Sequence, residues 1–346
     1  MIQQIDFEDA LELADPLFID VRAESEYYED HIPGSINIPI FNDEERKKIG
    51  ITYKNNSPEA ARKLGLSIVA PKLPLIINLI EKAGAGKNPV LYCWRGGLRS
   101  KALATVLELM NIPVYRLNGG YKRYRQFINA YFHRNVIPFK VVVLHGLTGT
   151  GKTQVLKVLT ELGAGAVDLE GLANNRGSVF GDVGLPPQPS QKLFESLLWS
   201  KLNQYRGHNY IIVECESKRI GKITIPSPLF NAMKEGKHIL LYDDLNHRIE
   251  RIIREYKVEL YANELIEALN KLKNRLGNET VQSLTKMINS GNFKPVVETL
   301  LVKYYDPLYN YPDHASPEFD YNLSSFDEEK AGQEIFRILS PRKERF

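Results

Sequence analysis

The feature that most constrains this chain is an eight-residue segment, 146–153, which reads Gly-Leu-Thr-Gly-Thr-Gly-Lys-Thr. It follows an apolar run, 139–145, that predicts a buried strand, and it precedes a helical pattern over 153–162. A Gly-x4-Gly-Lys-Thr loop between a strand and a helix is a phosphate-binding loop (P-loop), whose amides surround a di- or triphosphate. Lys152 would reach the outer oxygens and Thr153 would bind Mg²⁺. The predicted diphosphate-binding residues are Gly146, Leu147, Thr148, Gly149, Thr150, Gly151, Lys152 and Thr153.

Acidic residues follow two further strand-like runs downstream. The run 210–214 ends in Glu214, as a Walker B strand would, and 166–168 ends in Asp168. Either carboxylate, or Glu216 in the next loop, could serve as a Mg²⁺ ligand or general base, or could simply cap a helix or lie at the surface. The polar, glycine-rich loop 168–181 lies beside them and is typical of a substrate lid. Its candidate lid residues are Asn174, Arg176 and Ser178.

A second reactive loop lies earlier in the chain, at 93–99. An apolar run at 90–92 reaches Cys93, and a loop with two glycines and two arginines then opens a helical pattern over 101–107. Loop amides, the helix N-terminus and the guanidinium groups of Arg95 and Arg99 would favour an anion and the thiolate there. We therefore interpret Cys93 as a nucleophile, against the alternative of a half-buried cysteine at a strand end.

The region around Cys93 alternates short strands with helices. Strands are predicted at 16–22, 90–92 and 114–117, and a helix at 75–83. This alternation implies an α/β fold with a mainly parallel sheet and the reactive loop at its carboxyl edge. The predicted domains are 1–120, a basic and aromatic linker helix over 121–138, a P-loop domain over 139–245 and a mostly helical region over 246–346.

Composition adds only modest limits. Two cysteines, no apolar run near ~20 residues and no signal peptide at the N-terminus predict a cytoplasmic protein that does not enter membranes. A net charge of +3 is too small to demonstrate nucleic-acid binding, so that argument depends on local clusters, each of which could also be a solvated face. The candidate contacts are Lys122, Arg123, Arg125, Lys218, Arg219 and a three-residue repeat of Arg248, Arg251, Arg254 and Lys257.

Several motifs in the first 120 residues together resemble a rhodanese (sulfurtransferase) domain. They are Ile19-Asp20-Val21-Arg22, Glu24, Tyr27, the segment 31–39, the Cys93 loop and Leu117-Asn118-Gly119-Gly120. The resemblance implies a rhodanese-like parallel sheet, followed by a P-loop NTPase-like α/β domain with a helical C-terminal extension. Cys93 to Arg99 is Cys-x5-Arg, one residue longer than the usual sulfurtransferase loop and equal to that of rhodanese-fold phosphatases. The length of this loop is therefore compatible with two activities, phosphate ester hydrolysis and chalcogen transfer.

The combination of both loops in one chain resembles the bacterial tRNA 2-selenouridine synthases. The resemblance rests on 93–100, 146–153, 168–174 and 214–221. It implies action on tRNAs for Lys, Glu and Gln that carry 2-thiouridine at the wobble position, with a supplier of selenophosphate as a partner enzyme. Geranyl would pass from geranyl diphosphate to the sulfur, and selenium from selenophosphate would then replace the S-geranyl group.

The resemblance also implies roles for individual residues. The P-loop would hold the diphosphate of geranyl diphosphate with Mg²⁺, and the basic clusters would contact tRNA. Cys93 would handle selenium, with Arg95 and Arg99 as an anion clamp. The rest of the selenophosphate loop would be Trp94, Gly96, Gly97 and Leu98, and apolar candidates for a geranyl pocket near the lid are Leu172, Val179, Phe180 and Leu185.

Two other functions stay open on the residues alone. One is a sulfurtransferase or phosphatase fused to a P-loop kinase, although Tyr92 stands where those phosphatases usually have His before the cysteine. The other is a non-catalytic tRNA-binding protein, which would bind tRNA without consuming either small substrate.

Overall fold

The computed structural model describes residues 3–256 and 260–340, which form two compact units. The first unit comprises 1–133 together with 195–199, and the second comprises 134–194 and 200–346. Each unit has its own parallel sheet and its own apolar core. Each is therefore described by itself.

The first unit is built on five parallel strands in the order β1-β5-β4-β2-β3. β2 and β4 are apolar and buried almost throughout, as expected for a parallel sheet whose two faces are both covered. Sequence analysis predicted β2, β4, β5 and α5, and the structure confirms these elements. The strands are β1 Gln3–Ile5, β2 Pro16–Asp20, β3 Ile36–Asn37, β4 Asn88–Tyr92 and β5 Tyr115–Leu117; the helices are α1 Phe7–Leu11, α2 Glu24–Glu29, α3 Asp43–Asn55, α4 Pro58–Val69, η1 Ala70–Lys72, α5 Leu73–Gly84, α6 Leu98–Leu109 and α7 Gly120–Phe132.

Helix α7 contains most of the basic and aromatic stretch and belongs to the first unit. Tyr121, Tyr124, Ile128 and Phe132 recur on one face of the helix and are buried. Lys122 and Arg123 lie between them and are exposed. The aromatic residues therefore pack into the unit, and these two cations face solvent.

The helical run Pro58–Gly84 is, among the described residues, the one long and apolar enough to cross a membrane by length and composition. Prolines near the starts of η1 and α5 punctuate it. In α5, Ile76, Ile77 and Ile80 pack into the core of the first unit. Packing against the sheet thus accounts for much of the apolar character of α5.

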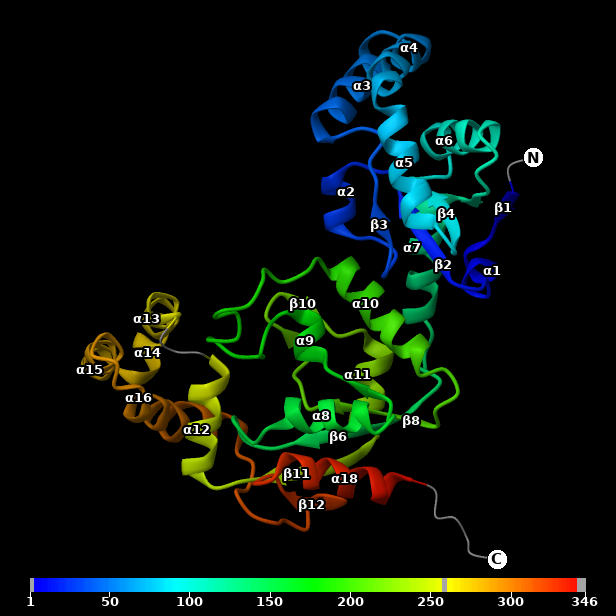
Figure 1. The fold of residues 1–346 in the computed structure, drawn as a ribbon. Coiled ribbons are helices and arrows are strands. Elements are labelled where there is room, and N and C mark those ends of the chain that lie inside the picture. Colours follow the sequence, from blue (N-terminus) through cyan, green and yellow to red (C-terminus); the bar gives the residue numbers. More distant parts are fainter. Residues whose placement is uncertain (1–2, 257–259, 341–346) are drawn as a thin grey trace, which may run out of the picture. The chain divides into compact units, whose positions relative to one another are not determined.

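The second unit has another five-stranded parallel sheet, in the order β12-β11-β6-β8-β7 (Figure 1). Helices α8 and α18 pack against each other beside it, and Gly332 of α18 lies against Val158 of α8. Sequence analysis predicted β6, β7, β8 and α8. The strands are β6 Lys140–His145, β7 Ala166–Val167, β8 Tyr210–Glu214, β9 Arg219–Ile220, β10 Ile223–Thr224, β11 Lys237–Tyr242 and β12 Tyr321–Ser324; the helices of this part are α8 Lys152–Glu161, α9 Leu169–Ala173, α10 Gln191–Gln204, α11 Ser227–Lys234 and α18 Glu328–Leu339.

A cluster of helices stands beside this sheet in the same unit, drawn in yellow and orange in Figure 1. It has a separate apolar core to which Leu269, Ile288 and Leu301 contribute. After this cluster the chain returns to the sheet, because β12 pairs with β11 and α18 packs on α8. The predicted helical region thus also completes the P-loop sheet. The cluster comprises α12 Leu245–Tyr256, α13 Ala262–Asn270, α14 Lys273–Leu276, α15 Asn278–Asn289, α16 Phe293–Leu300, η2 Leu301–Tyr305 and α17 Asp306–Tyr309.

Candidate functional site

The P-loop begins directly after β6, and its last two residues, Lys152 and Thr153, are the first two of α8. Gly149 and Gly151 have φ of +84° and +79°, a region that favours glycine. A Cβ on Gly151 would lie 3.0 Å from Cγ of Glu328 and 3.1 Å from Nε of Arg251, so a larger residue would crowd both side chains. Backbone conformation and packing therefore both require glycine here.

Lys152 folds back over its own loop. Its Nζ donates to the carbonyl oxygens of Gly146 at 2.8 Å and Leu147 at 3.2 Å, and Oγ1 of Thr150 donates to the same Leu147 carbonyl at 2.9 Å. A cavity of about 580 Å³ opens beside the loop, lined by Lys152 and Thr153 among others. An anion entering this cavity would meet the ammonium group and the N-terminus of α8.

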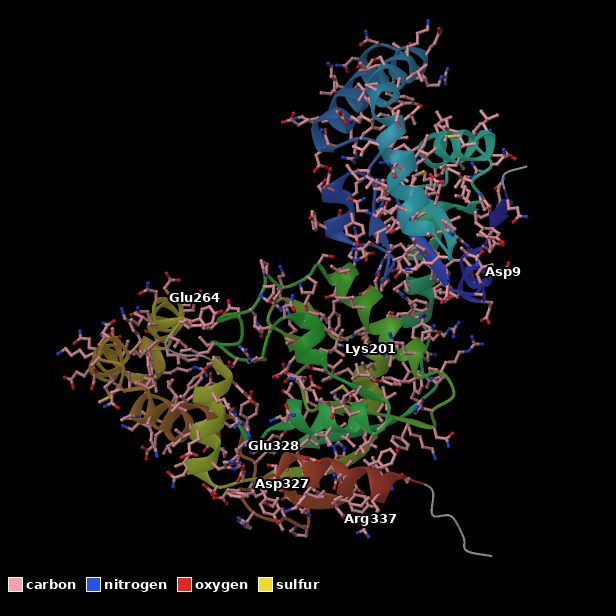
Figure 2. The ribbon with its side chains drawn as sticks, in the orientation of Figure 1. Asp9, Lys201, Glu264, Asp327, Glu328 and Arg337 are labelled. Atoms are coloured by element: carbon pink, nitrogen blue, oxygen red, sulfur yellow. The ribbon has the colours of Figure 1, made fainter. Side chains whose placement is uncertain are left out.

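Two arginines of α12 support the loop from behind. Nε of Arg248 donates to the Thr148 carbonyl at 2.9 Å, and its guanidinium pairs with Asp306 at 2.5 Å. Arg251 donates to the Gly149 carbonyl and pairs with Glu328 at 2.8 Å. Figure 2 labels Glu328, which lies at the start of α18.

Arg248 and Arg251 are both buried, so the prediction that they contact tRNA is wrong for these two residues. Residues three apart on a helix rotate by about 60° per step, so a three-residue repeat winds around the helix. Its first members point inward, whereas Arg254 is 73% exposed. Lys257, the fourth member, lies outside the described residues.

The other predicted cationic contacts differ in accessibility. Lys122, Arg123 and Arg219 are exposed. Arg125 and Lys218 are partly buried, and Nζ of Lys218 donates to Oγ of Ser227 at 3.0 Å. Among the predicted cations that the structure describes, the exposed ones stay candidates for tRNA contact.

Four glutamates line the P-loop cavity: Glu170 from α9, Glu216 from the loop after β8, Glu255 from α12 and Glu328 from α18. Glu170 and Glu216 form a hydrogen-bonded pair. Burial, the charge of Glu170 and a hydrogen bond with it together raise the pKa of Glu216 to about 9. Burial also raises the pKa of Glu170, while the Lys152 ammonium opposes the rise. Despite the nearby Lys152 ammonium, the Glu170–Glu216 pair therefore retains a proton at neutral pH when no metal ion is bound.

Neither Glu214 nor Asp168 is among the residues that line this cavity. Oε1 of Glu214 accepts from the amide of Glu170 at 2.7 Å, and its Oε2 has no hydrogen-bond partner among the described residues. Burial raises the pKa of Glu214 well above its usual value, and the charge of Asp168 raises it further. Oδ1 of Asp168 accepts from the amide of Gly171 at 2.6 Å and caps α9. Sequence analysis missed Glu170 because it considered acids at strand ends, whereas Glu170 lies one turn later.

The cavity offers donors that suit Mg²⁺. The hydroxyl of Thr153 and the carboxyl groups of Glu170 and Glu216 are hard oxygen ligands. Over 3–256 and 260–340, no group of three or more His, Cys, Asp or Glu side chains is placed to hold a metal. The residues therefore fit an ion held largely by phosphate oxygens and water.

The lid follows α9 and reaches the cavity. Arg176 and Ser178 line the P-loop cavity, and the guanidinium of Arg176 lies 4.5 Å from the ring centre of Tyr256. Asn174 instead ends α9 with φ of +47° and donates to the carbonyl of Pro187 at 3.2 Å. Two of the three predicted lid residues thus face the cavity, and Asn174 shapes the turn that precedes them.

A line of polar contacts runs from the cavity behind the P-loop. Sγ of Cys215, a cavity-lining atom, is 3.3 Å from the hydroxyl of Tyr311, which is 3.1 Å from Nδ1 of His145. Nε2 of His145 is 2.7 Å from Nδ1 of His238. Burial and the neighbouring His238 and Lys152 together lower the pKa of His145 to about 4. No sequence pattern predicts that these four residues lie together, because they are distant from one another in the chain.

In the first unit, Cys93 comes directly after β4 and is buried. Its Sγ lies 3.3 Å from Oγ of Ser100, in the first turn of α6, so the thiol faces the positive end of that helix. The carbonyls of Cys93 and Trp94 accept from the amides of Tyr121 and Lys122, both at 2.9 Å. The first turn of α7 therefore holds the loop through its backbone.

The two arginines of this loop are not equivalent. Arg99 donates to Glu26 at 2.8 and 3.3 Å, whereas Arg95 is exposed. Burial by itself would raise the pKa of Glu26, but the hydrogen bond and charge of Arg99 outweigh it and the pKa is lowered. Trp94 lies against Tyr121 with ring centres 5.1 Å apart. Of the other loop residues, Gly97 and Leu98 are exposed and Gly96 has φ of +62°.

The motif residues before this loop form its support. Asp20 and Arg22 are buried and pair at 2.6 Å. Arg22 also donates to the carbonyl of Asp30 at 2.7 Å, and its guanidinium lies 4.0 Å from the ring centre of Tyr121. These residues therefore fix the turns near the thiol.

The sequence matches two protein families. Residues 139–318 match the tRNA 2-selenouridine synthase AAA domain, and 4–127 match the rhodanese-like domain. Similar proteins include the tRNA 2-selenouridine synthase of Pseudomonas syringae pv. tomato, 35% identical over 92% of this chain and 94% of that protein. The synthase of Pseudomonas syringae pv. syringae is 36% identical over 87% and 90%, and that of Hydrogenovibrio crunogenus 32% identical over 90% and 93%.

Proposed function

The chain belongs to the tRNA 2-selenouridine synthase family, and from this premise we propose that it converts wobble 2-thiouridine to 2-selenouridine in two steps. The tRNA substrates would be those for Lys, Glu and Gln, which places the activity in the cytoplasm. The observation that carries the proposal is the presence of two anion-binding loops, each at the carboxyl edge of its own parallel sheet. One has a lysine and no thiol, and the other has a thiol.

The first step would be geranylation at the P-loop cavity. The sulfur of 2-thiouridine attacks C1 of geranyl diphosphate, the C1–O bond breaks, diphosphate leaves and the base loses its N3 proton. Lys152 and the N-terminus of α8 would stabilise the leaving diphosphate. Mg²⁺, when bound near Thr153, would neutralise further charge on that group. Glu170 and Glu216 line the cavity and are candidates to receive the proton.

The second step would be selenium exchange at the Cys93 loop. Selenium of selenophosphate attacks C2 of the geranylated base and geranyl thiol leaves; water then cleaves the Se–P bond and releases phosphate. Cys93 would act beside this anion as the selenium-handling thiolate, and Arg95 would supply free positive charge. Arg99 would have to leave or share Glu26 to act as a clamp, because the pair is formed in this structure. Alkylation prepares the exchange, since an S-geranyl group leaves more readily than a thiocarbonyl sulfur.

Two variants separate the steps. Full-length Cys93→Ser and Lys152→Ala would be incubated with 2-thiouridine tRNA, geranyl diphosphate and then selenophosphate, followed by mass spectrometry of the nucleosides. Cys93→Ser should accumulate the S-geranyl nucleoside without 2-selenouridine. Lys152→Ala should lose geranylation by a factor of about 100 or more, the scale for one group that stabilises developing charge.

The opposite pattern would overturn these assignments. Full selenation by Cys93→Ser would remove the thiol from the mechanism, and undiminished geranylation by Lys152→Ala would remove the P-loop. Lys330→Ala provides a control, because Lys330 on α18 is 82% exposed and is not among the residues that line the cavity. A variant of this kind should alter tRNA affinity at most.

A further inference from the structure

A second cavity adjoins the P-loop cavity in the same unit, and its lining is almost entirely apolar. It has a volume of about 60 Å³ and lies within the helix cluster. Phe180 contributes from the lid, Leu269 from α13, Ile288 from α15 and Val297 from α16. A cavity lined this way offers water few hydrogen-bond partners and favours hydrocarbon.

Three residues line both cavities: Thr148, Ile252 and Tyr256. Thr148 is part of the P-loop itself, and Ile252 and Tyr256 lie one turn apart on α12. A ligand with an anionic head and an apolar tail could therefore extend from one cavity into the other across these side chains. No covalent rearrangement and no contact outside this unit is needed for that placement.

We propose that the apolar cavity holds the distal end of the hydrocarbon chain whose diphosphate lies in the P-loop. This rests on the proposed function, because it assumes an allylic diphosphate as ligand. A cavity of about 150 Å³ is known to hold benzene, so about 60 Å³ holds the last two or three carbons. The remaining carbons of a ten-carbon chain would lie against Ile252 and Tyr256 in the larger cavity.

The limited volume of the cavity would then select for chain length. Burial of each methylene favours binding by a constant increment, so three buried carbons correspond to about fifty-fold in kcat/KM. A chain shorter by one isoprene unit would not reach the cavity, and one longer by a unit would exceed it. Discrimination among allylic diphosphates would therefore depend on residues more than a hundred positions after the P-loop in the sequence.

The test changes the cavity volume in opposite directions. Full-length Val297→Phe fills the cavity and Ile288→Ala enlarges it, since both side chains line it. Each variant and the wild type would be assayed with dimethylallyl, geranyl and farnesyl diphosphate on 2-thiouridine tRNA. Val297→Phe should lower the geranyl-to-dimethylallyl ratio of kcat/KM by about fifty-fold, and Ile288→Ala should raise the farnesyl-to-geranyl ratio.

Ratios measured on one preparation do not depend on the fraction of folded protein, so partial destabilisation does not obscure the result. If both ratios equal those of the wild type while geranylation persists, the cavity is only a packing defect and the inference is wrong. If the wild type uses none of the three diphosphates, or Lys152→Ala uses them undiminished, the proposed function itself is wrong. Should Val297→Phe fail to fold, an unchanged farnesyl-to-geranyl ratio in Ile288→Ala is sufficient to reject the inference.

Discussion

The Cys93 loop and the P-loop each connect a parallel strand to a helix, but different contacts hold the two loops in place. Each follows a buried parallel strand and opens a helix. In the Cys93 loop the carbonyls of Cys93 and Trp94 accept from backbone amides at the start of α7 at 2.9 Å, and a contact from a charged side chain, Arg116 to the Gly96 carbonyl, is long at 3.5 Å. Those of the P-loop accept from side chains, namely Lys152, Arg248 and Arg251. The first loop is therefore fixed by backbone fit and the second by buried charges.

The charges around the two loops also differ. One acid, Glu26, pairs with an arginine beside the Cys93 loop, and its pKa is lowered by Arg99 against the effect of burial. The P-loop cavity contains Glu170 and Glu216, whose pKa values are raised, first by burial. Glu26 at the first loop is thus stabilised as an anion, whereas Glu170 and Glu216 at the second are stabilised with a proton. Glu328, which also lines the P-loop cavity, behaves like Glu26, because burial would raise its pKa but the hydrogen bond with Arg251 lowers it. Four substitutions test this contrast.

Arg251→Ala should have the largest effect. It removes the buried guanidinium that pairs with Asp243 at 3.0 Å and Glu328 at 2.8 Å, which leaves Asp243 with His247 at 2.7 Å and Glu328 with only the distant Arg254 at 3.9 Å. We expect a loss of about 3–5 kcal/mol in the free energy of unfolding, measured by urea denaturation. Arg254→Ala, one turn along the same helix and exposed, is the matched control and should change stability by less than about 0.5 kcal/mol. Equal losses would mean that the P-loop does not depend on buried charge.

Gly120→Ala tests backbone fit at the Cys93 loop. Gly120 has φ of +57°, and a Cβ there would overlap the carbonyl of Cys93 and the amide of Gly96. The expected loss is about 3 kcal/mol, together with displacement of the thiol loop, measured by denaturation and by the rate of Cys93 alkylation. Gly50→Ala in α3 has open space around the added methyl and should instead stabilise by about 0.5–1 kcal/mol. A stable Gly120→Ala protein with unaltered thiol reactivity would contradict this view of the loop.

Glu216→Gln tests the protonated state in the P-loop cavity. The folded pKa of Glu216, about 9, exceeds its unfolded value, so folding takes up a proton between about pH 4.5 and pH 9. Stability from this group is present below pH 4.5 and is lost as the pH rises through 9. The Gln variant cannot ionise, so at pH 8 it should melt about 4 °C or more above the wild type, measured by calorimetry. The same difference at pH 4 as at pH 8 would argue against a raised pKa.

Glu26→Gln should show the opposite pH dependence and the smallest effect. The lowered pKa of Glu26 means that its contribution is present above the unfolded pKa and is lost as the pH falls through the folded value. At pH 7 the variant should melt about 2 °C below the wild type, and the difference should vanish on acidification to about pH 3. A deficit that persists in acid would indicate lost packing rather than a lost ion pair with Arg99.

Much of the fold was predictable from local pattern. Continuous apolar runs before Cys93 and Gly146 predicted β4 and β6, because a parallel strand covered on both faces must be apolar throughout. β12 was not predicted, because four residues at a sheet edge carry too little periodicity to separate from loop. Its pairing with β11 depends on a return of the chain after the helix cluster.

The site residues can likewise be separated into those that the sequence predicted and those that it did not. Motif spacing predicted the P-loop, Cys93 and Arg99, and a place in polar loops beside the P-loop predicted Glu216, Arg176 and Ser178. The structure places Lys152, Glu216, Arg176 and Ser178 around one cavity, and their roles stay predictions. The roles of Arg248 and Arg251 were misread, since a three-residue repeat fixes their separation on a helix but not which face is buried. Glu170 was overlooked within the motif 168–174, and Tyr311 was overlooked because it follows no strand or loop motif. Both line the cavity as a result of tertiary packing.

The sequence by itself determined where the two reactive loops stand and which chemistry each can support, since a loop of this length needs only neighbouring residues to form. Tertiary structure decided what surrounds them: which arginines hold the P-loop, which acids retain a proton and where an apolar cavity meets the anion site. These properties depend on burial and on contacts between segments a hundred residues or more apart, such as Arg251 with Gly149 and His145 with Tyr311. Burial is a property of the folded chain, and a linear pattern leaves it open.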